Sequence, residues 1–225
     1  MATARQLVLD LAVRPALGRA DFLVAPSNAL AVAWVDRWPD WPMRRLAVTG
    51  PQGAGKTHLA HVWSARAGAA ILPAEALPGL AVGEVDPRAA LAIEDADRVG
   101  GLGAAAEEAL FHLCNRLGQE GSLMLSGREP PARWPVGLAD LGSRLAAMPV
   151  ARLEPPDDAL LGAVLVKLFA DRQLAVAPDL VQYLVPRIER SFAAAEAVVA
   201  ALDRAGLARR RPVTARLAAE VLRAE

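Results

Sequence analysis

Short apolar runs alternate with amphipathic stretches over roughly the first two thirds of the chain. Five of the runs have the length and composition of buried strands, and stretches with helical spacing lie between them, notably 28–38, 55–67 and 104–118. The predicted strands are residues 44–50, 69–72, 89–94, 122–126 and 149–153. Strands that alternate with helices predict an α/β fold, with a parallel sheet covered by helices on both faces.

The pattern changes at Glu154-Pro155-Pro156, and beyond this point the sequence has helical spacing with almost no strand signal. Helices are expected to begin near Asp157 or Asp158, Pro178, Ser191 and Thr214. We therefore expect an N-terminal tail (1–18), an α/β core (19–153) and a small all-helical subdomain (154–225).

The chain has 225 residues, with 25 basic and 25 acidic side chains and no formal net charge. This balance argues against a protein that coats nucleic acid through a broadly basic surface, although it allows a local basic patch. Only two of the basic residues are lysines, Lys56 and Lys167. A lysine that falls within a motif is therefore informative.

Signals of secreted, disulfide-bonded and membrane-spanning proteins are missing from the sequence. The single Cys114 excludes a disulfide framework and a paired-cysteine metal site. No apolar run approaches the roughly 18 residues of a membrane span, and the N-terminus lacks the order of a signal peptide. We expect a soluble, cytoplasmic protein without a membrane partner.

The segment after the first predicted strand matches the phosphate-binding pattern GxxxxGK[ST]. Its glycines permit backbone angles that turn successive N–H groups toward one anion, and the following helix adds its positive dipole end. The lysine can reach the β- and γ-phosphates, and the threonine can ligate Mg²⁺. The residues expected to bind nucleotide are Gly50, Pro51, Gln52, Gly53, Ala54, Gly55, Lys56, Thr57 and His58.

A magnesium nucleotide site also needs a carboxylate from the end of a neighbouring strand, and residues 90–95 supply two. The apolar run carries Glu94 and Asp95 to the carboxyl edge of the sheet, where ligands bind in such folds. Glu94 takes the position expected for the metal, and Asp95 the position that orients or activates water. Because Asp97 follows closely, a solvated acidic turn is the alternative.

With both motifs and a helical C-terminal part, residues 19–225 resemble the AAA+ ATPases of the DnaA group. GKTHL (55–59) is similar to the group's phosphate loop, and residues 153–157 resemble its hinge into a helical lid. The resemblance implies that ADP or ATP binds with Mg²⁺ between core and lid. It also implies adenine-side contacts from the segment before the first helix, at Phe22, Leu23, Val24 and Asn28.

Two more segments carry the resemblance, and one position departs from it. Residues 123–126 and the following Pro130-Pro131 resemble the sensor-1 strand, which implies a catalytic role for Ser126. Leu141–Leu145 resembles the segment with the arginine finger, which would let Arg144 neutralise a γ-phosphate across a subunit boundary. The sensor-2 arginine is replaced by Ala193. Arg190, one turn earlier, is the candidate substitute, and the alternative is that the sensor is absent.

The tail and the end of the chain favour one branch of the group. The chain ends at Glu225, where the lid should end, whereas full initiators continue into a DNA-binding domain. The resemblance is therefore closest to the Hda-type regulators that inactivate the initiator. The sequence QLVLDL resembles their sliding-clamp-binding peptide, with contacts expected from Gln6, Leu7, Leu9 and Leu11. From the residues alone, a tail that packs on its own domain is the alternative.

The leading hypothesis is a negative regulator that binds the clamp and stimulates ATP hydrolysis by a DnaA-type initiator. It predicts no direct sequence-specific DNA binding, and it leaves open a homodimer and some ATP hydrolysis by the chain itself. The alternatives are a stand-alone ATPase similar to helicase loaders and a non-catalytic, clamp-tethered adaptor that binds nucleotide.

Overall fold

The computed structural model describes residues 22–223 and forms strands where the apolar pattern predicts them. They are β1 (Arg45–Thr49), β2 (Ala70–Pro73), β3 (Ala90–Glu94), β4 (Ser122–Gly127) and β5 (Val150–Arg152). The ends of each strand differ from the prediction by at most one residue.

The five strands run parallel in the order β2-β3-β4-β1-β5. The register pairs Thr49 of β1 with Gly127 of β4, and Ile93 of β3 with Leu125 of β4. The acidic strand β3 is therefore not hydrogen-bonded to β1, and the expectation that the two are neighbours is wrong. Because β4 lies between them, its carboxyl end borders both the glycine loop and the acidic residues.

Alternate residues of the strands enter two apolar layers, as the two-residue period of a strand requires. On one face Leu46 and Val48 pack with α1 (Ala29–Asp36) and α2 (Lys56–Ala67). On the other face Ala47 packs with residues of α3 (Ala104–Leu117) and α4 (Ala139–Ala146). This is the predicted sheet with helices on both sides.

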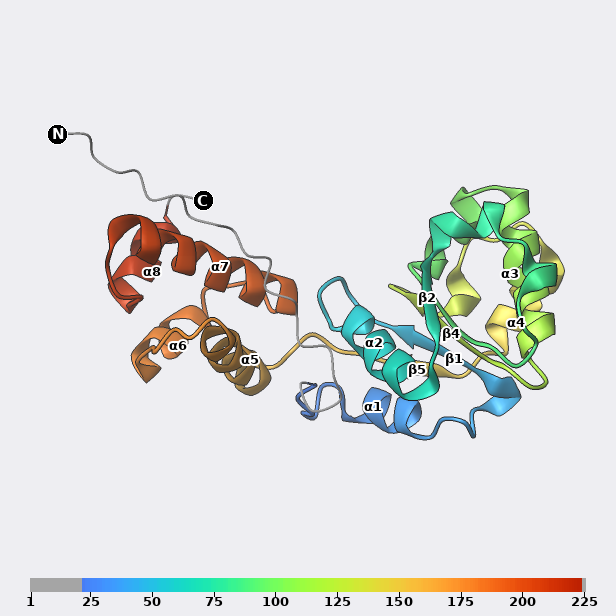
Figure 1. Cartoon of the computed structure of the whole chain (residues 1–225), viewed down its shortest axis with the longest axis horizontal. Coiled ribbons are helices and arrows are strands. Elements are labelled where there is room, and N and C mark those ends of the chain that lie inside the picture. The colour runs from blue at the N-terminus through green and yellow to red at the C-terminus, as the bar shows by residue number, and fades with distance from the viewer. Residues whose placement is uncertain (1–21, 224–225) are drawn as a thin grey trace.

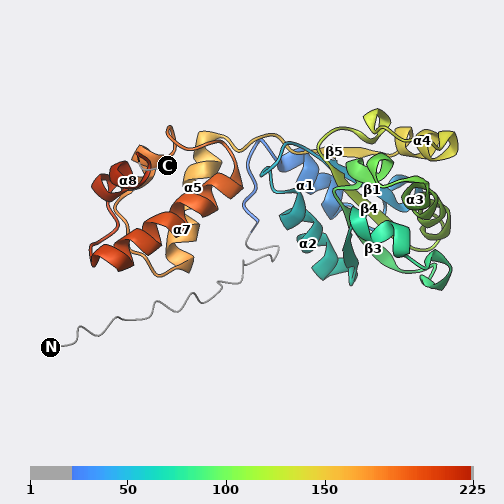
Figure 2. The same cartoon turned by 90° about the horizontal axis from the view of Figure 1, so that it is seen from above.

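Four helices follow the sheet and surround a third apolar cluster; we call them the lid. They are α5 (Asp158–Asp171), α6 (Pro178–Leu184), α7 (Phe192–Arg209) and α8 (Ala215–Val221). Side chains of Asp157, Ser191 and Thr214 accept backbone N–H groups as N-caps, which confirms these predicted starts. Figures 1 and 2 show the lid at one end of the molecule and α3 and α4 at the other.

Short 3₁₀ helices complete the connections. They are η2 (Pro42–Arg44), η3 (Ala74–Gly79), η4 (Val82–Glu84), η5 (Ala96–Gly101) and η6 (Pro131–Arg133). None of the helices between residues 22 and 223 combines the length and hydropathy of a bilayer span.

Candidate functional site

The loop between β1 and α2 has the backbone of a phosphate cradle. Gly53 and Gly55 have φ values of 74° and 96°, in the left-handed region that residues with a Cβ rarely adopt. Lys56 is the first residue of α2, and its Nζ donates to the carbonyl oxygens of Gly50 and Pro51 at 2.8 and 2.9 Å. The ammonium therefore lies inside the loop.

Acidic side chains from the end of β3 lie within electrostatic reach of Lys56. Burial lowers the pKa of Lys56, and the negative charges of Asp95, Asp97 and Glu94 oppose that shift. Glu94 has its Oε1 buried without a hydrogen-bond partner among residues 22–223, and Thr57 is exposed at the start of α2. An unpartnered buried carboxylate oxygen suits a cation, and Mg²⁺ commonly binds one or two carboxylates together with substrate phosphates.

Asp95 and Ser126 meet at the carboxyl edge of the sheet. The backbone N–H of Asp95 donates to Ser126 Oγ at 3.2 Å, and Asp95 itself has a left-handed conformation with φ of 50°. The Asp95 side chain is exposed, whereas Ser126 is buried near the end of β4. The structure thus brings together two of the three residues predicted to be catalytic.

The amino-terminal end of α7 rests on the phosphate loop. The Phe192 N–H donates to the Gly53 carbonyl oxygen at 2.9 Å. A Cβ placed on Gly53 would lie 3.6 Å from the Cβ of Ala193, so the position expected for sensor 2 faces the loop. Arg190 instead pairs with Asp158 at 2.8 Å, and both side chains are mostly exposed.

The segment that leads into α1 passes beside the start of α2. The Phe22 ring packs edge-on against His58, with centroids 5.0 Å apart. Asn28 stands at the N-cap of α1, but its side chain makes no cap bond to that helix. Its Nδ2 donates to the Leu23 carbonyl oxygen at 2.9 Å, so Asn28 fixes the segment instead. Leu23 is half-buried, and Val24 is exposed.

Arg144, the third predicted catalytic residue, lies on α4 at the opposite edge of the sheet. Its guanidinium carbon is 4.9 Å from the centre of the Phe111 ring, and its Nε is buried without a hydrogen-bond partner among the described residues. Together with Arg45, at the start of β1, it lines a recess of about 430 Å³. Because five strand residues rise roughly 16 Å, the length of β1 separates this recess from the phosphate loop. Met43, Asp140, Ser143 and Ala147 complete the lining.

Two buried charged residues without a sequence motif hold this edge together. Arg45 is 6% exposed and donates from Nη2 to the Cys114 carbonyl oxygen at 2.6 Å. That oxygen lies in the last turn of α3, where a cation is favourable. Glu107 of α3 is 7% exposed and accepts the N–H groups of Gly137 and Leu138, just before α4. These bonds tie α3 to β1 and to the segment that carries Arg144.

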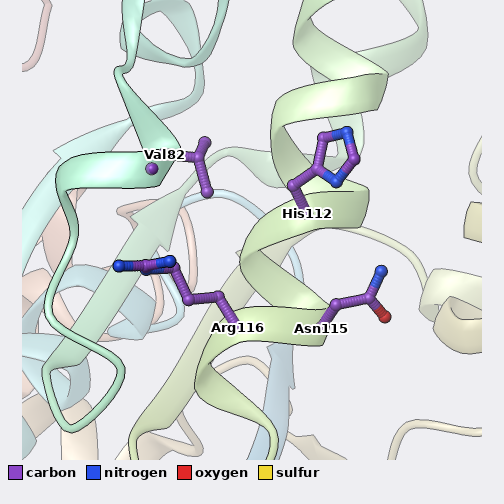
Figure 3. Close-up of a pocket in the computed structure, with 5 residues that line it drawn as sticks. Val82, His112, Asn115 and Arg116 are labelled. Atoms are coloured by element: carbon purple, nitrogen blue, oxygen red, sulfur yellow. The ribbon is translucent and has the colours of Figure 1, made fainter.

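A separate surface pocket of about 470 Å³ lies between α3 and η4. Val82, Gly83, His112, Asn115 and Arg116 line it. Figure 3 shows Arg116 extending from α3 toward η4, and its Nε donates to the Val85 carbonyl oxygen. The pocket contains none of the predicted site residues, and Arg116 fastens the segment before β3 to α3.

The tail residues Gln6, Leu7, Leu9 and Leu11 lie outside the described residues. Clamp binding through this tail therefore stays a prediction.

Comparison with known proteins relates the chain to replication initiators. It is 27% identical to the chromosomal replication initiator protein DnaA of Thermomicrobium roseum, over 90% of this chain and 48% of that protein. The chain is a homologue of DnaA. It spans about half the length of this DnaA relative. No protein-family model matches the chain.

Solved structures of DnaA share the fold. Domain III of Thermotoga maritima DnaA matches with a TM-score of 0.79 and 19% identity, over 93% of this chain and 97% of that one. AMPPCP-bound DnaA from Aquifex aeolicus matches with a TM-score of 0.72 and 17% identity, over 87% and 67%. The chain therefore has the AAA+ P-loop fold of DnaA domain III, as the resemblance implies.

Proposed function

We propose that this chain is an Hda-type regulator of replication initiation. It binds an adenine nucleotide between core and lid, attaches to the DNA-loaded sliding clamp through residues 6–11, and presents Arg144 to ATP held by a DnaA-type initiator. The observation that carries the proposal is the position of Arg144, at the sheet edge away from its own phosphate loop. An arginine there serves a nucleotide bound by another subunit.

The phosphate loop, the acidic residues after β3 and the start of α7 lie together, which supports the proposed nucleotide binding. DnaA of the same fold is known with bound AMPPCP, an ATP analogue. Within residues 22–223 no three His, Cys, Asp or Glu side chains group as a metal site. We therefore assign Mg²⁺ to the Thr57 hydroxyl and the Glu94 carboxylate together with the nucleotide's own phosphates. A bound Mg²⁺ would neutralise phosphate charge.

The setting of Arg144 supports its action on a partner. Stacking on Phe111 holds the guanidinium by its face and leaves N–H groups at its edge for an acceptor. In other NTPases an arginine supplied across a subunit boundary accelerates hydrolysis by about 10³–10⁵. The same geometry suits a γ-phosphate that the partner brings into the recess.

The recess is also electrically suited to phosphate. Burial raises the pKa of the Cys114 thiol to about 11, and the positive charges of Arg45 and Arg144 oppose that rise. Two guanidinium groups therefore act on the same small region. An anion that enters the recess is attracted by both charges, and the Asp140 carboxylate in the lining opposes part of that attraction.

The decisive experiment measures hydrolysis of initiator-bound ATP in the presence of clamp, DNA and this protein. Arg144→Ala should reduce the stimulated rate by about 10³ or more. Arg133→Ala is the matched control, because Arg133 is an exposed arginine that pairs only at the surface with Glu129. Stimulation by Arg144→Ala at the wild-type rate would show that the proposed role is wrong.

A second candidate function is ATP hydrolysis by the chain itself. The convergence of Lys56, Glu94, Asp95 and Ser126 at one edge favours it. Turnover by the isolated protein that Lys56→Ala abolishes, and that the clamp leaves unchanged, would support this reading over the first.

A further inference from the structure

The phosphate loop needs more positive charge than Lys56 alone supplies. ATP brings three phosphates, and nucleotide sites of this kind neutralise them with several cations. The lid residues that touch the loop are Ser191, Phe192 and Ala193, which carry no charge. The nearby Arg190 is already paired with Asp158. The core offers a second side-chain cation that has no such partner.

Arg128 stands at that position. It follows β4 directly, and its Nη2 lies 3.4 Å from Oε1 of Gln52 in the phosphate loop. Its positive charge also contributes to the lowered pKa of Lys56, which places the two cations near each other. The side chain is exposed and forms no ion pair among the residues that the structure describes. It is thus available to a ligand in the loop.

The backbone of Arg128 is fixed, although its side chain is exposed. Its N–H donates to the Asp97 carboxylate at 2.9 Å. The preceding Gly127 is closely enclosed, because a Cβ there would lie 2.8 Å from Trp134 and 3.1 Å from Asp97. The Arg128 backbone is therefore held beside the loop, and the exposed side chain can change its rotamer to reach a ligand there.

The side from which Arg128 approaches the loop favours contact with the terminal phosphate of a bound nucleotide. Arg128 reaches the loop from the same strand as Ser126, whose Oγ accepts the Asp95 N–H. Asp95 is the residue predicted to activate water, and water attacks the γ-phosphate. The 3.4 Å contact with Gln52 is longer than an ordinary hydrogen bond, so exchanging it for a charge-assisted bond to phosphate costs little.

We propose that Arg128 binds the terminal phosphate of a nucleoside triphosphate in this chain's own phosphate loop and sets the preference for triphosphate over diphosphate. The proposal rests on nucleotide binding at that loop, as proposed above. Arg128 supplies from the core a second cation at the loop, where the lid residues in contact are uncharged.

Equilibrium titration with ADP and with AMPPCP tests the proposal on the whole chain. Arg128→Ala should weaken AMPPCP binding about tenfold or more, and ADP binding less than about threefold. Arg128→Lys keeps the charge but not the planar fork, and should recover part of the AMPPCP affinity. The control is Arg133→Ala, five residues beyond Arg128, which should change neither affinity because the Arg133 side chain pairs with Glu129 at the surface.

Lys56→Ala separates this proposal from nucleotide binding itself. It should abolish binding of both nucleotides. Suppose that wild type binds ADP and AMPPCP, and that Lys56→Ala binds neither. If Arg128→Ala then changes the two affinities equally, or changes neither, the role of Arg128 is overturned while nucleotide binding at the loop stands. Wild-type protein that binds neither nucleotide would overturn both proposals.

Discussion

Gly53 is the point where the phosphate loop and the lid meet. Its φ of 74° suits glycine, and its carbonyl oxygen accepts the Phe192 N–H. A Cβ at this position would lie 2.6 Å from the Cβ of Ser191, which is closer than carbon atoms pack. One residue thus requires glycine both for its backbone conformation and for the approach of α7.

Gly53→Ala should therefore strain the loop and push α7 away from it. The left-handed conformation alone costs about 1–2 kcal/mol, and the clash adds to it. Denaturant unfolding should show this loss of stability, and titration should show weaker nucleotide binding. Gly79→Ala is the control, because a Cβ there meets nothing within 4 Å. Equal effects of the two substitutions would contradict the proposed contact.

At the residue scale the sequence motifs predict the centre of the candidate site but not its surroundings. The spacing of Gly50–Thr57 identifies the loop because the chemistry requires those residues in that order. Arg128 has no such pattern, and one arginine among the many in the chain gives no signal. Its relevance comes from the pairing of β4 with both β1 and β3, which brings distant segments together.

At the element scale the capped start of α7 holds the lid against the loop. Ser191 Oγ accepts the Ala194 N–H at 3.1 Å, and Ser191 is 4% exposed. The next residue, Phe192, donates to Gly53 and places its ring against Gly55. The first turn of this helix is therefore part of the site.

Ser191→Ala should cost about 1 kcal/mol through the lost N-cap. It should also weaken nucleotide binding, because a frayed first turn loosens the contact with Gly53. Thr214→Ala removes the corresponding cap of α8, within the lid and away from the loop. It should lower stability without changing affinity. Comparable affinity loss in both variants would mean that lid stability, not this contact, controls binding.

The elements themselves follow from local patterns, but their arrangement does not. All five strands are predicted, since a short apolar run that ends near turn residues marks a buried strand locally. The position of β4 between β1 and β3 depends on pairing across long stretches of chain, which no local pattern records. The side chain of Asn28 shows the same limit, because it bonds to the Leu23 carbonyl oxygen and not to the helix α1 that follows it.

At the scale of the whole molecule, the contact between the phosphate loop and the lid lies far from Arg144. The lid lies at one end and α4 at the other (Figure 1), and β1 spans the core between the phosphate loop and the recess. The proposed clamp peptide belongs to the tail, outside the described residues. Each proposed activity therefore depends on its own residues.

Single substitutions should accordingly separate the three activities. Lys56→Ala should lose nucleotide binding but keep clamp retention. Gln6→Ala should keep nucleotide affinity but weaken clamp retention about tenfold, since an added extended segment depends on its anchor side chains. Arg144→Ala should keep both and lose only the stimulation of initiator-bound ATP. A clamp pull-down, a nucleotide titration and a hydrolysis assay on the same preparations measure this. Equal clamp retention by Gln6→Ala and wild type would remove the tail from the proposal. The proposed role of Arg144 would remain, because it depends on the position of Arg144 and not on the tail.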